Sequence, residues 1–147
     1  MSDSDLLKLY SARILALAAD IPHHGRLANP QGSARRRSPL CGSTVGADVV
    51  VRDGRVAEFA QDVKACALGQ AAAAVLGAAV IGRSLPELEA ARDQLRAMLN
   101  EAGPIPTAPF AGYEVLLPAR AFKNRHASIL LALEAVCEAI VQAQTAA

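Results

Sequence analysis

Apolar residues near the start of the chain recur every three or four positions, the spacing of one face of an α-helix. They are Leu7, Tyr10, Ile14, Leu17 and Ile21. Ser2 or Ser4 can cap the start of this helix, because a serine hydroxyl accepts a hydrogen bond from a free backbone N–H. The pattern therefore predicts a first helix that ends at Pro22.

Residues 22–40 have the composition of a loop, because prolines and glycines interrupt any regular pattern there. A short extended piece is expected near residues 35–40. Two β-prone segments, 48–52 and 55–63, then flank Asp53-Gly54. Asp-Gly is typical of a two-residue hairpin turn, in which both residues need a positive φ. The sequence therefore predicts an antiparallel hairpin.

Three helices are predicted after the hairpin. The first covers the alanine-rich residues 66–82, and the second begins at the capping box Ser84-Leu85-Pro86-Glu87 and stops near Gly103. A proline-rich loop precedes the last helix, which is expected from about Pro118 to Ala143. This order indicates an α+β fold, with a small antiparallel sheet of about three strands packed against about four to five helices. We expect residues 1–147 to form a single domain.

The composition fits a globular protein, with 52% hydrophobic and 20% charged residues in 147. A net charge of +1 predicts no general attraction to nucleic acid or to an anionic membrane. The longest uncharged stretch, 65–82, is too weakly apolar to favour a membrane span. The first residues lack a basic signal-like region, so we expect a cytoplasmic protein with reduced thiols. Arg35-Arg36-Arg37 is either a solvated loop or a docking patch for an acidic partner.

Two of the three cysteines flank the predicted hairpin. Cys41 precedes it and Cys66 follows it, at the predicted start of a helix. A hairpin returns the chain to its starting point, so both thiols are expected at one end of the sheet. The positive end of a helix dipole favours thiolate, the form that binds soft metals or attacks sulfur. The alternative is that both cysteines fill the core; for Cys137, in the middle of the last helix, we expect that role.

Other candidate residues are less informative from the sequence alone. His23 and His24 are adjacent, which favours solvated or capping roles over a shared metal, and His126 lies early in the last helix. The chain has no Walker loop, Gly-x-Gly-x-x-Gly motif, Gly-x-Ser-x-Gly elbow, Cys-x-x-Cys pair or His-Glu-x-x-His motif. We therefore expect no enzyme.

Several short motifs, in order along the chain, resemble those of NifU/IscU/SufU-type iron–sulfur cluster scaffold domains. Ser38-Pro39-Leu40-Cys41-Gly42-Ser43 resembles the family motif Asn-Pro-x-Cys-Gly-Asp. Residues 62–71 resemble the second cysteine motif, which opens an Ala/Ser-rich helix. Pro118-Ala119-Arg120 and His126-Ala127-Ser128 resemble the last motif, Pro-x-Arg…His-Cys-Ser. The resemblance extends from Tyr10 to Leu130 and implies a NifU/IscU-like fold.

The resemblance also implies a site for a transient [2Fe–2S] cluster, iron or zinc, supplied with sulfur by a cysteine desulfurase. Cys41 and Cys66 match the first two cysteine ligands, and His126 matches a histidine present in some members. Ser43 stands at the position of the family aspartate and is a poor ligand, and Ala127 stands at the position of the third cysteine. Cys137 cannot replace that cysteine, because ten helical residues separate it from Ala127 by roughly 15 Å.

Three functions follow from these expectations. The first is a scaffold for iron–sulfur assembly that binds iron, zinc or a labile cluster through Cys41 and Cys66, with His126 as a further ligand. The second is a non-catalytic interaction module that docks on a cysteine desulfurase or another assembly protein. The third is a sulfur-relay protein in which Cys41 or Cys66 accepts persulfide sulfur.

Overall fold

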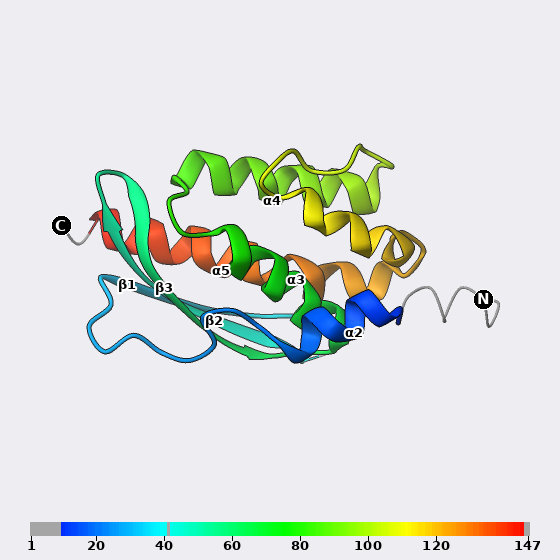
Figure 1. Ribbon diagram of the computed structural model, residues 1–147, viewed down its shortest axis with the longest axis horizontal. Coiled ribbons are helices and arrows are strands. Elements are labelled where there is room, and N and C mark those ends of the chain that lie inside the picture. The colour runs from blue at the N-terminus through cyan, green and yellow to red at the C-terminus, as the bar shows by residue number, and fades with distance from the viewer. Residues whose placement is uncertain (1–9, 41, 146–147) are drawn as a thin grey trace.

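The computed structural model describes residues 10–40 and 42–145, and shows a small sheet covered on one face by helices (Figure 1). Within this part of the chain, three strands form one antiparallel sheet in the order β1-β2-β3. The strands are β1 (Gly32–Arg37), β2 (Thr44–Arg52) and β3 (Arg55–Lys64). The helices are α2 (Ala12–Ala19), α3 (Ala67–Ala79), α4 (Leu85–Asn100), the 3₁₀ helix η1 (Ala111–Ala121) and α5 (Lys123–Thr145). The predicted α+β class is confirmed.

The hairpin is formed by β2 and β3, as predicted. Asp53 and Gly54 make the turn with φ values of 54° and 74°, which is the conformation that Asp-Gly favours. β2 begins four residues earlier than predicted, because Thr44 to Val49 also pair with β1, and β3 ends one residue later than predicted. The extended piece predicted at 35–40 lies earlier in the structure, in β1 at Gly32–Arg37, because the chain turns after Arg37. Ser38 N donates to Ser43 O at 2.8 Å in that turn.

The first helix differs from its prediction. Within the described residues, α2 begins after Ser11, whose hydroxyl accepts a hydrogen bond from Ile14 N at 3.3 Å. Tyr10 and Ser11 are therefore not helical, although the sequence pattern places them within a helix, because the serine side chain caps a helix start at this position. The proposed caps Ser2 and Ser4 lie outside the described residues.

The last helix also begins later than predicted. Pro118 lies inside η1, and Phe122 then adopts φ −112° and ψ 74°, outside the helical region. The α-helical part therefore starts at Lys123. The other two predictions are confirmed: α3 occupies the alanine-rich segment, and the capping box of α4 has both reciprocal hydrogen bonds between Ser84 and Glu87.

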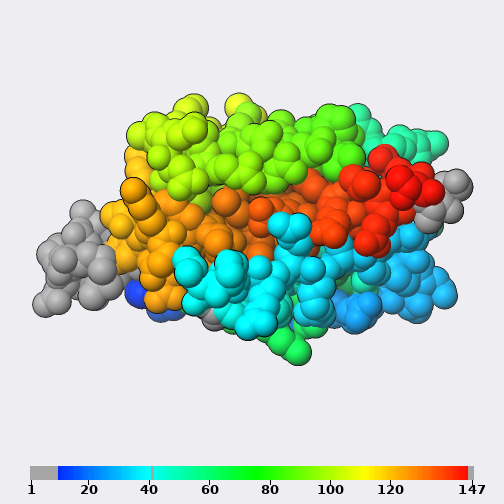
Figure 2. Space-filling view, turned by 180° about the vertical axis from the view of Figure 1, so that it is seen from behind, coloured from blue at the N-terminus to red at the C-terminus, as the bar shows by residue number. Residues whose placement is uncertain are grey.

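The central element of the core is α5, which packs on β1, β2, α3 and α4. Seen from behind, it lies between α4 and the segment that contains the end of β1 and the start of β2 (Figure 2). By length and composition α5 could cross a membrane, but 72% of its apolar stretch is buried inside the protein, as in a core helix. Cys137 is 5% exposed within it, which confirms its predicted packing role, and burial raises the pKa of its thiol to about 11.

The other face of the sheet carries a buried carboxylate. Asp48 is 3% exposed and accepts hydrogen bonds from Arg26 Nε at 2.7 Å, Ser33 Oγ at 2.7 Å and Leu27 N at 3.1 Å. Burial opposes ionisation of Asp48, but these hydrogen bonds together outweigh it and lower its pKa. This carboxylate attaches the loop that contains Arg26 and Leu27 to the sheet.

Candidate functional site

Cys66 lies at the junction of the sheet and α3. It occupies the N-cap position of α3, two residues after the end of β3, with φ −64° and ψ 169°. Its side chain makes no capping hydrogen bond, so the sulfur is available for other contacts. The thiol is half-buried, and Sγ lies 3.5 Å from Ser128 Oγ. The sequence placed Cys66 at this helix start correctly.

Two buried hydroxyls extend from Cys66 into the protein. Ser128 Oγ, on α5, donates a hydrogen bond to Ser43 Oγ at 3.1 Å. Ser43 directly precedes β2, and the two serines are 4% and 1% exposed. The structure therefore brings together side chains from the starts of β2, α3 and α5. We call Ser43, Cys66 and Ser128 the hydroxyl–thiol cluster.

Close packing of α3 on α5 makes this cluster possible. A Cβ atom at Gly69 would lie 2.6 Å from Ser128 Oγ and 2.8 Å from Ala65 Cβ, closer than real Cβ atoms approach other atoms. Glycine at position 69 thus allows the first turn of α3 to approach Ser128. The sequence alone did not indicate Ser128, although it follows the Ala127 position of the last motif.

Cys41, the other predicted thiol, lies outside the described residues. The turn around it is described on both sides. Gly42 has φ 71° and donates from its backbone N to Ser38 O at 3.1 Å, and Ser43, the next residue, joins the hydroxyl–thiol cluster.

His126 is 5% exposed, and both of its ring nitrogens have hydrogen-bond partners. Nδ1 lies 2.7 Å from Asn100 Oδ1, and Nε2 lies 2.9 Å from the Ala119 carbonyl oxygen. These contacts connect α5 to the end of α4 and to η1. Coordination of a metal by His126 would require the loss of one of them. In the described part of the chain, no group of three or more His, Cys, Asp or Glu side chains is arranged to hold a metal ion.

Basic side chains surround this end of the sheet. Arg37 and Lys64 lie opposite Thr44 on its two neighbouring strands. The arginine run belongs to the edge strand β1, so the predicted loop is wrong, although all three arginines are exposed. Arg35 pairs with Asp62 at 2.7 Å, and this hydrogen bond lowers the pKa of Asp62. Within the described residues no ion pair of Arg37 is found, which leaves its charge available at this end of the sheet.

Similarity to known proteins is clear in the solved structures. A NifU-like protein (N-terminal) from Brucella abortus superposes with a TM-score of 0.93 and 45% identity, over 97% of this chain and 99% of that one. A hypothetical protein has a TM-score of 0.77 and 25% identity, over 92% and 98% of the two chains. A putative iron–sulfur cluster assembly scaffold protein for the SUF system from Fervidobacterium islandicum AW-1 shares the fold, with a TM-score of 0.80, 17% identity and coverage of 91% and 98%.

No protein-family profile matches the chain, and no curated protein matches it. The fold is nevertheless that of a NifU-like N-terminal domain, and Cys66 lies at the start of α3 within it. At 45% identity over almost the whole of both chains, the protein belongs to the NifU-like family. The predicted resemblance is confirmed.

Proposed function

We propose that this protein is a scaffold or carrier in iron–sulfur cluster assembly, which binds iron, zinc or a labile [2Fe–2S] cluster through Cys41 and Cys66. The observation that carries the proposal is the half-buried thiol of Cys66, next to Ser128 and Ser43, in a fold of the NifU-like family. Cys41 is two residues from Ser43 in the sequence. The covalent chain therefore supports a second thiol near the first.

The number of ligands determines which cargo is favoured. A [2Fe–2S] cluster is typically held by four protein ligands, usually thiolates. Two cysteines supply half of that set, and Ala127 offers no donor atom. A cluster therefore needs ligands from a second subunit or from a partner protein, whereas iron or zinc can complete its coordination with solvent. Ligation by His126 stays a prediction, and it would break a contact with Asn100 or Ala119.

Anaerobic reconstitution tests the proposal. The full chain is incubated with ferrous iron and sulfide, and bound metal is measured by elemental analysis and visible absorbance. We expect Cys41→Ala and Cys66→Ala to bind metal at least about tenfold more weakly, a loss of about 1.4 kcal/mol or more, because each variant lacks one ligand. Cys137→Ala is the matched control, because Cys137 is buried in α5. Equal metal content in all three variants would refute the site, and a His126→Ala variant tests the third ligand.

A sulfur relay is the second candidate, and the partial exposure of Cys66 favours it. In this step the Cys66 thiolate attacks the outer sulfur of a persulfide on a cysteine desulfurase. A new S–S bond forms on Cys66, the old one breaks, and the desulfurase cysteine leaves as a thiolate. Mass spectrometry after incubation with a charged desulfurase should show one added sulfur atom on this protein. Its absence from both Cys41 and Cys66 would exclude the relay.

A non-catalytic docking module is the third candidate, favoured by the poor ligands at positions 43 and 127 and by the exposed arginines of β1. The proposed partner in each case is a cysteine desulfurase or another assembly protein, and the proposed location is the cytoplasm. Co-purification with a desulfurase tests the docking role. Loss of binding on Arg37→Glu would support it, and no binding by the unmodified chain would exclude it.

A further inference from the structure

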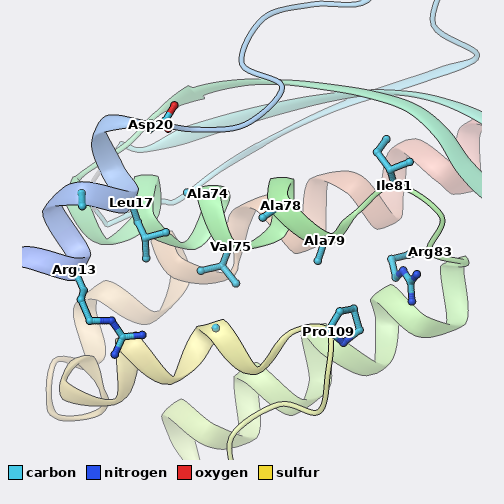
Figure 3. A pocket seen from close by; sticks show the side chains of 12 residues that line it. Arg13, Leu17, Asp20, Ala74, Val75, Ala78, Ala79, Ile81, Arg83 and Pro109 are labelled. Carbon is cyan, nitrogen blue, oxygen red and sulfur yellow. The ribbon is translucent and has the colours of Figure 1, made fainter.

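A groove of about 770 Å³ lies on the half of α3 that is remote from Cys66. Its floor is formed by α3, one wall by α2, and the opposite side by Pro109 and Gly112 at the start of η1 (Figure 3). Ala74 and Val75 form the inner part of the floor, and the exposed residues Ala78 and Ile81 continue it. The groove is therefore apolar and lined mainly by small side chains.

Charged side chains are found mainly at its ends. Arg13, on α2, and Arg83, just before α4, stand at opposite ends of the row of alanines (Figure 3). Arg13 forms no ion pair within the described residues. Arg83 Nη1 pairs with Glu87 Oε2 at 2.9 Å, but its buried Nε has no hydrogen-bond partner in that part of the chain. Asp20 is the one acidic residue of the lining.

We propose that this groove docks an amphipathic α-helix of a partner protein, with the apolar face of the helix on α3 and acidic residues near both helix ends. Small floor residues permit a close approach between helices, and recognition of an amphipathic helix in an apolar groove is a recurrent binding mode. A helix about 10 Å in diameter, with a rise of about 1.5 Å per residue, occupies about 120 Å³ per residue. The groove volume therefore corresponds to about six residues of a bound helix. Carboxylates at the helix ends would complement Arg13 and Arg83.

The position of the groove would let a partner protein bind the proposed scaffold without covering its cargo site. Cys66 occupies the N-cap position of α3, and Val75 lies nine residues further along, roughly 14 Å along the helix axis. A helix bound over residues 74–81 leaves Cys66 uncovered. Ile81 is 44% exposed at the groove, and Ala78 is exposed beside it. A docked helix would cover apolar surface that is exposed to water in the isolated protein.

A designed peptide tests this docking site. The probe is a fluorescent 15-residue helix with leucines spaced three and four residues apart and glutamates in its first and last turns. Its partner probe carries lysines in place of the glutamates. Fluorescence anisotropy with the full chain should show saturable binding of the glutamate peptide and at least about fivefold weaker binding of the lysine peptide, since opposite charges at both ends are replaced by like charges.

Two variants and a control locate the binding. Ala78→Glu places a carboxylate on the exposed floor and should weaken binding at least about tenfold. Arg13→Glu should weaken the glutamate peptide and strengthen the lysine peptide, a reversal that a folding defect would not produce. Val141→Glu, on α5 outside the groove, is the control for an added surface charge. Circular dichroism checks that all variants are folded.

Three outcomes would overturn the proposal. The first is that the glutamate peptide does not bind at concentrations up to about 1 mM. The second is that Ala78→Glu and the unmodified chain bind the peptide equally well. The third is that sedimentation shows a dimer of the unmodified chain that the Ala78→Glu substitution dissociates. The last would identify a second copy as the occupant. Metal content is measured on the same samples, and Ala78→Glu should leave it unchanged. The docking proposal and the metal proposal therefore fail independently.

Discussion

The two ends of α3 differ in what lies over them, although one alanine-rich segment forms both. At the N-terminal end, Gly69 packs tightly against Ser128, and Cys66 contacts a buried hydroxyl. In the C-terminal half, Ala78 is exposed and borders an open groove. The composition of the helix does not distinguish these regions. What differs is which element packs on each, since α5 covers the first and no described element fills the groove over the second.

The largest expected effect tests whether both ends are equally important for stability. Leu68 and Leu76 lie in the two halves of α3, and both are 0% exposed. Replacement of either by alanine should lower the free energy of unfolding by about 2–5 kcal/mol, through lost burial and the cavity left behind. Urea denaturation measures this loss as a lower midpoint, with the dependence of the free energy of unfolding on urea concentration unchanged. If Leu76→Ala cost less than about 1 kcal/mol, the groove half of α3 would contribute little to the core.

A smaller effect should be confined to the N-terminal end. Gly69→Ala should lower the free energy of unfolding by about 1–3 kcal/mol, because the added methyl group overlaps Ser128 Oγ. This loss would occur although alanine has the higher helix propensity. The comparison is Ala78→Gly, which should cost only about 1 kcal/mol through propensity. Stabilisation by Gly69→Ala would mean that α3 and α5 are not closely packed at this point.

The hydroxyl–thiol cluster should have a measurable pairwise coupling. In a double-mutant cycle of Ser43→Ala and Ser128→Ala, we expect a coupling of about 0.5–1.5 kcal/mol, the net value of one hydrogen bond. This coupling energy is obtained from unfolding curves of the unmodified chain, the two single variants and the double variant. Additive losses would show that the 3.1 Å contact between the two hydroxyls does not stabilise this end.

The smallest effect lies outside α3 and concerns pH. Asp48 has a lowered pKa in the folded protein, so its stabilising contribution is complete above its ordinary pKa of about 3.9. That contribution is lost as the pH falls through the lower folded value. Asp48→Asn should therefore reduce the decline of stability below about pH 4, measured by thermal unfolding between acidic and neutral pH. Asp53→Asn, in the exposed hairpin turn, is the control, and an equal change in both variants would contradict the assignment.

Local signals in the sequence predicted local structure well. Asp53-Gly54 forms the hairpin turn, and Ser84 with Glu87 forms the capping box, because each depends on residues that are neighbours in the chain. Predictions failed where tertiary contacts decide the boundary. The start of α5 was placed at Pro118, but this residue belongs to η1, which packs on α4 and α3.

The candidate site shows the same division. Cys66 at the start of a helix followed from sequence, because the end of the hairpin and the alanine-rich pattern meet there. The contact with Ser128, 62 residues away, did not follow, because it depends on how closely α3 packs on α5. For His126, the sequence suggested a metal ligand, whereas the structure shows hydrogen bonds to Asn100 and Ala119.

The sequence by itself determined the class of fold, the hairpin, most helices and the family resemblance, since these depend on periodicity, turn chemistry and short motifs. Only the tertiary structure decided that Ser43, Cys66 and Ser128 meet, and that α2, α3 and η1 enclose an apolar groove between two arginines. The physical reason is that both features join segments far apart in the chain. Their separation is set by the packing distance between helices, which short-range pattern does not encode.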